Sequence, residues 1–255
     1  MLNSERQNII LEMLAEKRTV LVTDLVKQFD VSVATIRRDR TERESKNLLR
    51  RVYGGAVPAG ENPWTPFATR ADLHAKEKAL IGKKAAELIN DDETVIIDTG
   101  TTVQEVVKNI KKKPLKVFTN SLPALNELSD ASSAMSVVCL GGLFMQKQMA
   151  MLGSISEKTL QHYFFDKAVI GTAGVDLKYG LSGFSQESTD MCSALIGRSK
   201  EVILVADSSK FGKVNHIAFA TLDQIDVIVT DSNLDQSYRT ALEEKGIRLI
   251  IVPVN

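Results

Sequence analysis

Thr23–Asp39 reads TDLVKQFDVSVATIRRD, and this stretch decides the fold of the N-terminal part of the chain. Its first residue is of a type that caps helices, and a helix starting there would bury Leu25, Val26 and Phe29. Asp30-Val31 then provides a tight turn, and a second helical pattern follows at once. Two short helices joined by a tight turn predict a helix-turn-helix unit.

The second helix of this pair has the composition of a helix that contacts DNA. Ser32 caps it, and the small residues Ala34 and Thr35 let its first turn approach base edges in the major groove. Arg37 and Arg38 follow and can reach phosphates or guanine bases. We therefore expect these five residues to form the DNA-contacting face.

The flanking segments complete a small winged module. Upstream, Ser4 can cap a helix whose apolar stripe lies within residues 9–14. Downstream, residues 48–56 read LLRRVYGGA, and β-prone residues that end in Gly-Gly fit a small wing lying along the DNA backbone. The DNA contacts expected from this wing are Arg50, Arg51 and Tyr53.

Charge supports the same interpretation. The formal net charge of the chain is +0, but residues 37–51 hold seven Arg or Lys against three acids, a local charge of +4. A local basic stripe is the electrostatic footprint of a phosphate-binding surface. The alternative is a helical dimerisation module with a solvated charged face, and the spacing of the motif favours operator double-stranded DNA as the partner.

A composition change separates this module from the rest of the chain. Residues 57–66 contain three of the six prolines and few periodic apolar residues, which is typical of a linker. We predict a winged helix-turn-helix domain over residues 1–57, a linker over 58–74 and a larger effector-binding domain over 75–255.

The larger domain alternates β-prone and helical patterns. Strands are expected at 94–98, 116–119, 136–140, 167–170, 202–206, 227–230 and 248–252, and helices at 76–89, 102–110, 122–128, 187–199 and 235–245. Strands rich in Val and Ile that alternate with helices predict an α/β fold with a mostly parallel sheet covered on both faces.

Small polar residues follow several of these strands. Asp98-Thr99-Gly100-Thr101-Thr102 ends a predicted strand and opens a predicted helix, where backbone N–H groups and hydroxyls can bind an anion. Gly-Lys-Ser/Thr and GxGxxG motifs are both missing there, so a sugar phosphate fits better than a nucleotide. An ordinary strand–helix turn is the alternative. The effector residues expected at this edge are Asp98, Gly100, Thr101, Thr102, Thr119, Asn120, Gly141 and Gly142.

Residues 32–39 (SVATIRRD) and 48–56 closely resemble the N-terminal signature of DeoR-family bacterial repressors. In the second half DTGTT at 98–102, TNS at 119–121 and DSSKFG at 207–212 also match, and residues 165–176 are most similar to the glucitol-operon repressor branch. The resemblance implies a repressor of sugar or sugar-alcohol catabolism. Such a protein is released from DNA by a phosphorylated intermediate and has an effector domain like the ribose-phosphate isomerase fold.

The resemblance adds further effector candidates. In an isomerase-like fold, carboxylates and a lysine placed like Asp176, Glu187 and Lys210 would bind the hydroxyls of a sugar. The alternatives are a turn residue for Asp176 and a surface lysine for Lys210.

One departure from the family pattern concerns the third helix. Its apolar stripe should continue from Ile36 to positions 40 and 43, where the family has leucines and this chain has Arg40 and Arg43. We hypothesise that the helix is rotated or frayed there. The rival interpretations are that acids such as Glu42, Glu44 or Asp24 pair with these arginines, or that both arginines face phosphate.

Some classes of function are not expected. The three histidines and two cysteines lack metal-ligand spacing, so we predict no metal, no cofactor and no catalytic residue. We expect a cytoplasmic protein without membrane spans, and a homo-oligomer (dimer or tetramer), because helix-turn-helix proteins commonly read paired half-sites. A sugar-phosphate isomerase-like enzyme with an accessory N-terminal module is the alternative function.

Overall fold

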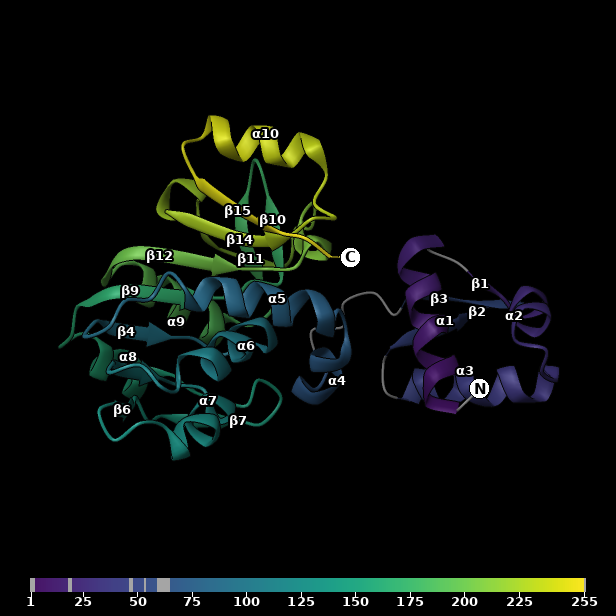
Figure 1. The fold of residues 1–255 in the computed structure, drawn as a ribbon, viewed down its shortest axis with the longest axis horizontal. Helices are drawn as coiled ribbons and strands as arrows, with labels where there is room; N and C mark the ends of the chain where they lie inside the picture. The colour runs from purple at the N-terminus through teal and green to yellow at the C-terminus, as the bar shows by residue number, and fades with distance from the viewer. Residues whose placement is uncertain (1–2, 18–19, 46–47, 53, 59–64, 255) are drawn as a thin grey trace. The chain divides into compact units, whose positions relative to one another are not determined.

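The computed structural model describes residues 3–17, 20–45, 48–52, 54–58 and 65–254. They form two compact units, Met1–Arg70 and Ala71–Asn255, each with its own hydrophobic core (Figure 1). Each unit is described in turn below.

The first unit is a winged helix-turn-helix, as predicted. Its elements are α1 (Asn3–Lys17), β1 (Val20–Leu21), α2 (Val22–Phe29), α3 (Val33–Ser45), β2 (Leu49–Val52) and β3 (Gly55–Pro58). The three strands form an antiparallel sheet in the order β1-β3-β2. Ile10, Leu25, Ile36 and Leu49 are almost fully buried, so each element contributes to one small core.

Local chemistry sets the turn between α2 and α3. Asp30 ends α2 with a left-handed backbone, a conformation that aspartate tolerates better than most residues. The Ser32 hydroxyl accepts the Thr35 N–H at 3.1 Å, which confirms the predicted cap of α3. The predicted Thr23 cap is wrong, because α2 begins at Val22 and has no side-chain cap. The Ser4 side chain lies outside the described residues.

The third helix is neither frayed nor rotated. It runs without a break from Val33 to Ser45, and its buried residues are Ile36, Asp39, Arg40 and Arg43, so the predicted helical phase is correct. Arg40 donates to the backbone carbonyl of Gly55, and Arg43 donates to Asn8 Oδ1 at 2.8 Å. An uncharged oxygen therefore accepts a hydrogen bond from each guanidinium. Of the acids considered from sequence, Glu44 acts on Arg40 through its charge.

The second unit is built around a seven-stranded parallel sheet in the order β15-β14-β12-β9-β4-β5-β6. These strands are β4 (Thr94–Ile97), β5 (Lys116–Thr119), β6 (Ser136–Cys139), β9 (Phe165–Ile170), β12 (Ser199–Val205), β14 (Val227–Asp231) and β15 (Arg248–Val252). Every strand predicted from sequence is present, and the α/β fold class is confirmed.

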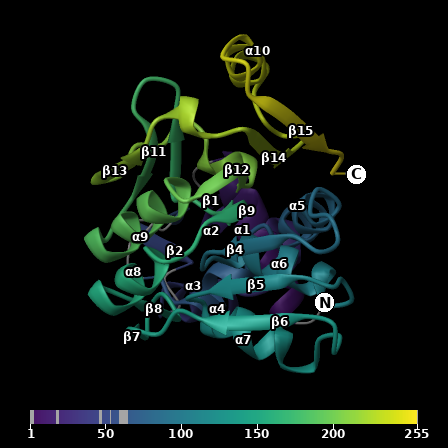
Figure 2. The same ribbon diagram turned by 90° about the vertical axis from the view of Figure 1, so that its left-hand side faces the viewer.

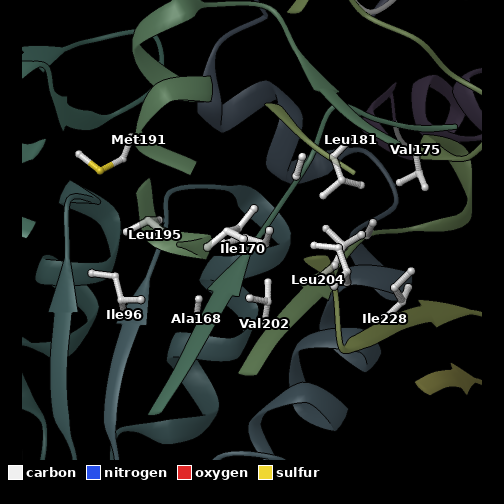
Figure 3. Packing of buried hydrophobic residues seen from close by; sticks show 14 of the residues in the cluster. Ile96, Ala168, Ile170, Val175, Leu181, Met191, Leu195, Val202, Leu204 and Ile228 are labelled. Carbon is white, nitrogen blue, oxygen red and sulfur yellow. The ribbon is translucent and has the colours of Figure 1, made fainter. Parts of the chain in front are cut away.

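Helices cover both faces of this sheet. One face carries α5 (Ala75–Ala86), α6 (Thr101–Ile110) and α7 (Leu122–Glu127), and the other carries α8 (Ser154–Leu160), α9 (Gln186–Ile196) and α10 (Gln236–Glu244). Successive strand residues serve opposite faces, since Val95 and Ile97 pack in one core and Ile96 in the other. Figure 2 shows the sheet between these layers, and Figure 3 shows Met191 and Leu195 of α9 near Ile96 and Ile170.

Several short elements were not predicted. Strands β10 (Gly174–Asp176), β11 (Gly180–Gly183) and β13 (Ile217–Ala220) form a small antiparallel sheet, and β7 (Leu143–Met145) pairs with β8 (Ala150–Leu152) as a hairpin. Helix α4 (Phe67–Asp72) occupies part of the stretch predicted to be a linker, and the division between the units falls inside it, after Arg70.

The two buried arginines of α3 generate a stability prediction. Burial of a charged group costs several kcal/mol in lost hydration, a penalty that a leucine does not carry. We therefore expect Arg40→Leu combined with Arg43→Leu to raise the opening free energy of α3 by about 1 kcal/mol, the scale of one buried side chain. Amide hydrogen exchange of α3 in the full chain measures this quantity. Faster exchange in the double variant would contradict the prediction.

Candidate functional site

The exposed face of α3 carries the residues predicted to contact DNA. Ala34, Arg37 and Arg38 are exposed, while Ile36 between them is fully buried in the core. Thr35 is half-buried, and its hydroxyl bonds that of Ser32 at 2.9 Å. The first two turns of the helix therefore present small side chains followed by two arginines, as a helix in the major groove requires.

The wing contributes one described arginine to this face. The Arg51 guanidinium forms an ion pair with Glu44 of α3 and donates to Thr41 Oγ1 at 2.8 Å. These bonds leave Arg51 partly exposed and fix its direction. The Arg50 side chain and Tyr53, also predicted to contact DNA, lie outside the described residues.

A buried polar network holds α1 against α3. Arg6 Nε lies 2.6 Å from Asp39 Oδ2, and Gln7 Nε2 donates to Asp39 Oδ1 at 3.2 Å. The hydrogen bond to Asp39 is the main reason why the pKa of Arg6 is raised. Breaking a buried pair by removing one partner costs about 3–5 kcal/mol, so this network fixes the orientation of α3. Sequence reasoning missed Arg6 and Asp39, which carry only the generic signal of charged residues on helices that also bear apolar stripes.

The sheet topology defines a second candidate site. The chain adds β5 and β6 on one side of β4, then returns to place β9 on the other side. In open α/β sheets ligands bind at such a switch point, beyond the carboxyl ends of the strands. Asp98 follows β4 directly and Asn120 follows β5, so two predicted effector residues flank this point.

Asp98 is a buried carboxyl at the centre of this edge. Its Oδ2 accepts a hydrogen bond from Cys192 Sγ at 3.2 Å, and it is 5% exposed. Burial raises the pKa of Asp98 to about 6, against the opposing effects of the Thr99 N–H, Cys192 and the neighbouring Asn120. Burial, together with the nearby Asp98 charge, raises the pKa of the Cys192 thiol well above its ordinary value. The predicted set did not include Cys192, because only the fold brings α9 to β4.

Asn120 is the clearest candidate for a ligand contact. Asn120 is 1% exposed, and its Oδ1 has no hydrogen-bond partner. Its amide N–H group faces Asp98 and helps to lower the pKa of that carboxyl as a hydrogen-bond donor. A buried unsatisfied polar atom costs about 1–3 kcal/mol. A ligand hydroxyl could satisfy the Oδ1 atom, since a hydroxyl can donate.

The β7–β8 hairpin lies against the same strand ends. Met151 N donates to the Asn120 carbonyl at 2.8 Å, and Leu122 N donates to the Met149 carbonyl at 2.9 Å. The Thr99 hydroxyl donates to the Gln148 carbonyl at 3.1 Å. The turn of the hairpin is therefore bonded to the segments that follow both β4 and β5.

The start of α6 lacks a side-chain cap. Gly100 precedes it with φ 152° and ψ 150°, a backbone conformation that is essentially limited to glycine, and no side chain caps the helix. Thr101 and Thr102 form the first turn and are mostly buried. Thr119 is different, because its hydroxyl donates to the Ile97 carbonyl and accepts from Ser121 N, which gives it a structural role.

Basic groups gather around Asp207, after β12. Burial alone would raise the pKa of Asp207, but Lys210, His74 and Lys78, together with a Ser209 hydrogen bond, lower it below its ordinary value. Asp207 Oδ2 is buried and has no hydrogen-bond partner. The structure thus places the predicted Lys210 beside a buried carboxylate. It adds His74, which no motif or spacing in the sequence marks as a site residue.

The remaining candidates differ in their surroundings. Ser156, which is fully buried, donates to the Gly141 carbonyl and so holds the Gly141-Gly142 turn. Asp176 Oδ1 accepts the N–H groups of residues 178 and 179, which is the turn role considered as its alternative. Glu187 is exposed in the first turn of α9. None of these contacts brings these four residues to Asp98 or Asn120.

The structure also contains a cavity that is not lined by the predicted effector residues. A cavity of about 320 Å³ lies between α8 and α9, and its lining contains none of the predicted effector residues. Among the described residues, no group of three His, Cys, Asp or Glu could hold a metal ion. In the same part of the chain, no helix is long and apolar enough to cross a membrane.

The geometry defines a two-part regulator, with a DNA-binding winged helix-turn-helix followed by an α/β sensor unit. Residues 6–61 match the DeoR-like helix-turn-helix domain, and residues 73–232 match the DeoR C-terminal sensor domain. The chain belongs to the DeoR family of transcriptional regulators. This membership makes it a regulator rather than an enzyme, so the isomerase alternative is set aside.

Relatives match along the whole chain. It is 32% identical to the uncharacterized HTH-type transcriptional regulator YulB of Bacillus subtilis, covering 100% of this chain and 99% of the relative. It is 31% identical to the HTH-type transcriptional repressor GlcR of Bacillus subtilis, covering 98% and 97%. It is 29% identical to the glycerol-3-phosphate regulon repressor of Escherichia coli, covering 98% and 99%. Ribose 5-phosphate isomerase A from Neisseria gonorrhoeae is similar over 52% of each chain, with a TM-score of 0.39 and 16% identity.

The exposed arginines of α3 generate a DNA-binding prediction. Arg37→Ala and Arg38→Ala should each weaken DNA binding and reduce the slope of log K against log salt by about one unit per lost phosphate contact. Fluorescence anisotropy at several salt concentrations measures both quantities. Arg248→Ala is the control, because Arg248 is exposed in the other unit. Unchanged affinity and slope in both α3 variants would exclude this face as the DNA contact.

The buried Asp98 generates a pH prediction. Because its folded pKa, about 6, exceeds its ordinary value of 3.8, the folded state binds the proton more tightly. Stability should therefore fall as pH rises from about 4 to about 6, by up to about 3 kcal/mol from this group. Asp98→Asn should flatten the dependence of the melting temperature on pH between about pH 5 and about pH 6.

Asp166→Asn serves as the control for the pH prediction. The hydrogen bond with Lys200 lowers the pKa of Asp166, so that group has finished titrating below this range. Its replacement should leave the pH slope unchanged. If Asp98→Asn kept the slope of the parent, Asp98 would not be the titrating group.

Proposed function

We propose that the chain represses a sugar or sugar-alcohol catabolic operon and leaves operator DNA when a phosphorylated sugar or hexitol binds its sensor unit. The observation that carries this proposal is the buried Asn120 amide at the switch point of the sheet, whose Oδ1 has no hydrogen-bond partner. A polyhydroxylated ligand supplies what that amide lacks.

The phosphate would bind at the start of α6. The uncapped N–H groups after Gly100 and the hydroxyls of Thr101 and Thr102 favour an anion, and the helix dipole adds to this preference. Lys210 would contribute positive charge from the loop after β12. Asp98 and Asn120 would then receive the hydroxyls of the sugar, while Asp176, Glu187 and the Gly141-Gly142 turn stay candidates for its far end.

The names of relatives support repression and phosphorylated effectors. GlcR is named a transcriptional repressor, and the Escherichia coli relative is named for the glycerol-3-phosphate regulon. We carry these properties to the present chain as part of the proposal, together with kinship to the glucitol-operon branch. The proposal also includes a homo-oligomer, a cytoplasmic location and the domain limits 1–57 and 75–255.

Effector binding can be tested directly. A panel of hexose, pentose and hexitol phosphates should include one compound that raises the melting temperature of the sensor unit and weakens DNA binding. The coupling free energy should be about 1–3 kcal/mol, typical of allosteric links. Thr101→Val and Lys210→Ala should abolish both responses and leave DNA affinity without effector unchanged.

The matched control for the lysine is Lys158→Ala, an exposed position on α8. It should respond as the parent does. If Thr101→Val and Lys210→Ala also responded like the parent, the effector would bind elsewhere.

A further inference from the structure

Two arginines of α3 are similarly buried but bond different elements. Arg40 is 6% exposed and Arg43 is 7% exposed, one turn apart on the same helix. Arg40 Nη2 donates to the carbonyl of Gly55, the first residue of wing strand β3. Arg43 Nη2 donates to Asn8 of α1. Of these two hydrogen bonds, the one from Arg40 joins α3 to the wing.

Gly55 is the point at which the wing is anchored. It pairs with Leu21 of β1 and with Val52 of β2, so all three strands meet there. A Cβ atom at this position would collide with the Val20 carbonyl, which shows how closely the strands approach. A donor that fixes the Gly55 carbonyl therefore fixes the whole wing relative to α3.

A second contact joins the outer wing strand to the same helix. The Arg51 N–H of β2 donates to Glu44 Oε1 at 2.8 Å, and the Arg51 guanidinium bonds Glu44 and Thr41. Both wing strands are thus bonded to the second half of α3. Arg40 bonds β3 in the core, and Glu44 bonds β2 at the surface. The ion pair is partly exposed and is worth at most about 1 kcal/mol, so the buried contact of Arg40 is the stronger constraint.

Arg40 also interacts through its charge with two arginines that are expected to contact DNA, Arg37 and Arg51. Burial lowers its pKa, and the neighbouring charges of Arg51 and Arg37 lower it further, while Glu44 opposes them. Burial of a guanidinium carries a loss of hydration that an apolar side chain of similar volume does not have. A gain in stability therefore does not explain an arginine at position 40, whereas its hydrogen bond to the Gly55 carbonyl, which an apolar side chain cannot make, gives it a role in placing the wing.

We propose that Arg40 is a positioning residue for DNA binding, which holds the wing against α3 so that Arg51 and the arginines of α3 meet the phosphate backbone together. The inference rests on the helix-turn-helix unit and is independent of the effector proposed above. It also gives different roles to the two arginines that depart from the family pattern. Arg40 fixes the position of the wing, and Arg43 bonds α1.

The test compares Arg40→Leu with Arg43→Leu in the full chain. The probe is a DNA duplex that the parent chain has selected from a random pool, titrated at several salt concentrations. Arg40→Leu should bind at least about tenfold more weakly and lower the salt slope by about one unit, since a displaced wing loses a phosphate contact. Arg43→Leu should stay within about twofold of the parent in affinity and keep its slope. The melting temperature of neither variant should fall.

Two further measurements separate positioning from a general structural effect. Amide hydrogen exchange in Arg40→Leu should become faster in β2 and β3 and stay unchanged in α1. Arg40→Lys keeps a charged donor and should recover most of the lost affinity. If Arg40→Leu did not fold, Arg40→Met and Arg43→Met would replace the leucine pair. Equal DNA affinities and slopes in the two matched variants, or unchanged exchange of the wing, would overturn the proposal.

Discussion

The order in which parallel strands enter the sheet is the constraint on which the sensor unit depends. Parallel strands need a crossover for every connection, so all seven carboxyl ends lie at one edge. The return of the chain from β6 to β9 leaves β4 in the interior of the sheet, between β9 and β5, with Asp98 directly after it. Burial at that interior position is what changes the chemistry of Asp98, and the adjacent strand β5 makes Asn120 its neighbour.

The sequence predicted the regular elements well because their signals are local. Val- and Ile-rich runs such as residues 94–97 and 227–231 can be strands only in the interior, and the helices between them show clear periodicity. The β7–β8 hairpin and the small β10-β11-β13 sheet were missed, since their strands have only three or four residues each, and β11 pairs with β13 far along the chain. The helix α4 was missed for a related reason, because its six residues follow a proline-rich stretch.

Site residues could be predicted where a sequence motif marks them. They could not be predicted where the fold alone brings distant residues together. Asp98, Gly100 and Asn120 lie at strand ends that the sequence marks, and the structure finds them at one edge. Cys192 reaches Asp98 across 94 positions, and His74 influences Asp207 from the N-terminal end of α5. Such pairs have no sequence periodicity. Conversely, the hydroxyl of Thr119 and the Gly141-Gly142 turn match the motif but are bonded within the protein.

Buried polar groups have opposite roles in the two units. In the winged module Arg6, Asp39 and Arg43 are bonded within the protein, so they define how the helices sit on one another. In the sensor unit Asn120 Oδ1 and Asp207 Oδ2 are buried without hydrogen-bond partners, a cost that a bound ligand would remove. A carboxyl with a pKa of about 6 is partly protonated near neutral pH, and a phosphate bound at the start of α6 would raise that pKa further by repulsion. Asp98 would then donate a hydrogen bond to the sugar rather than repel its phosphate, so burial of Asp98 and anion binding at α6 favour each other.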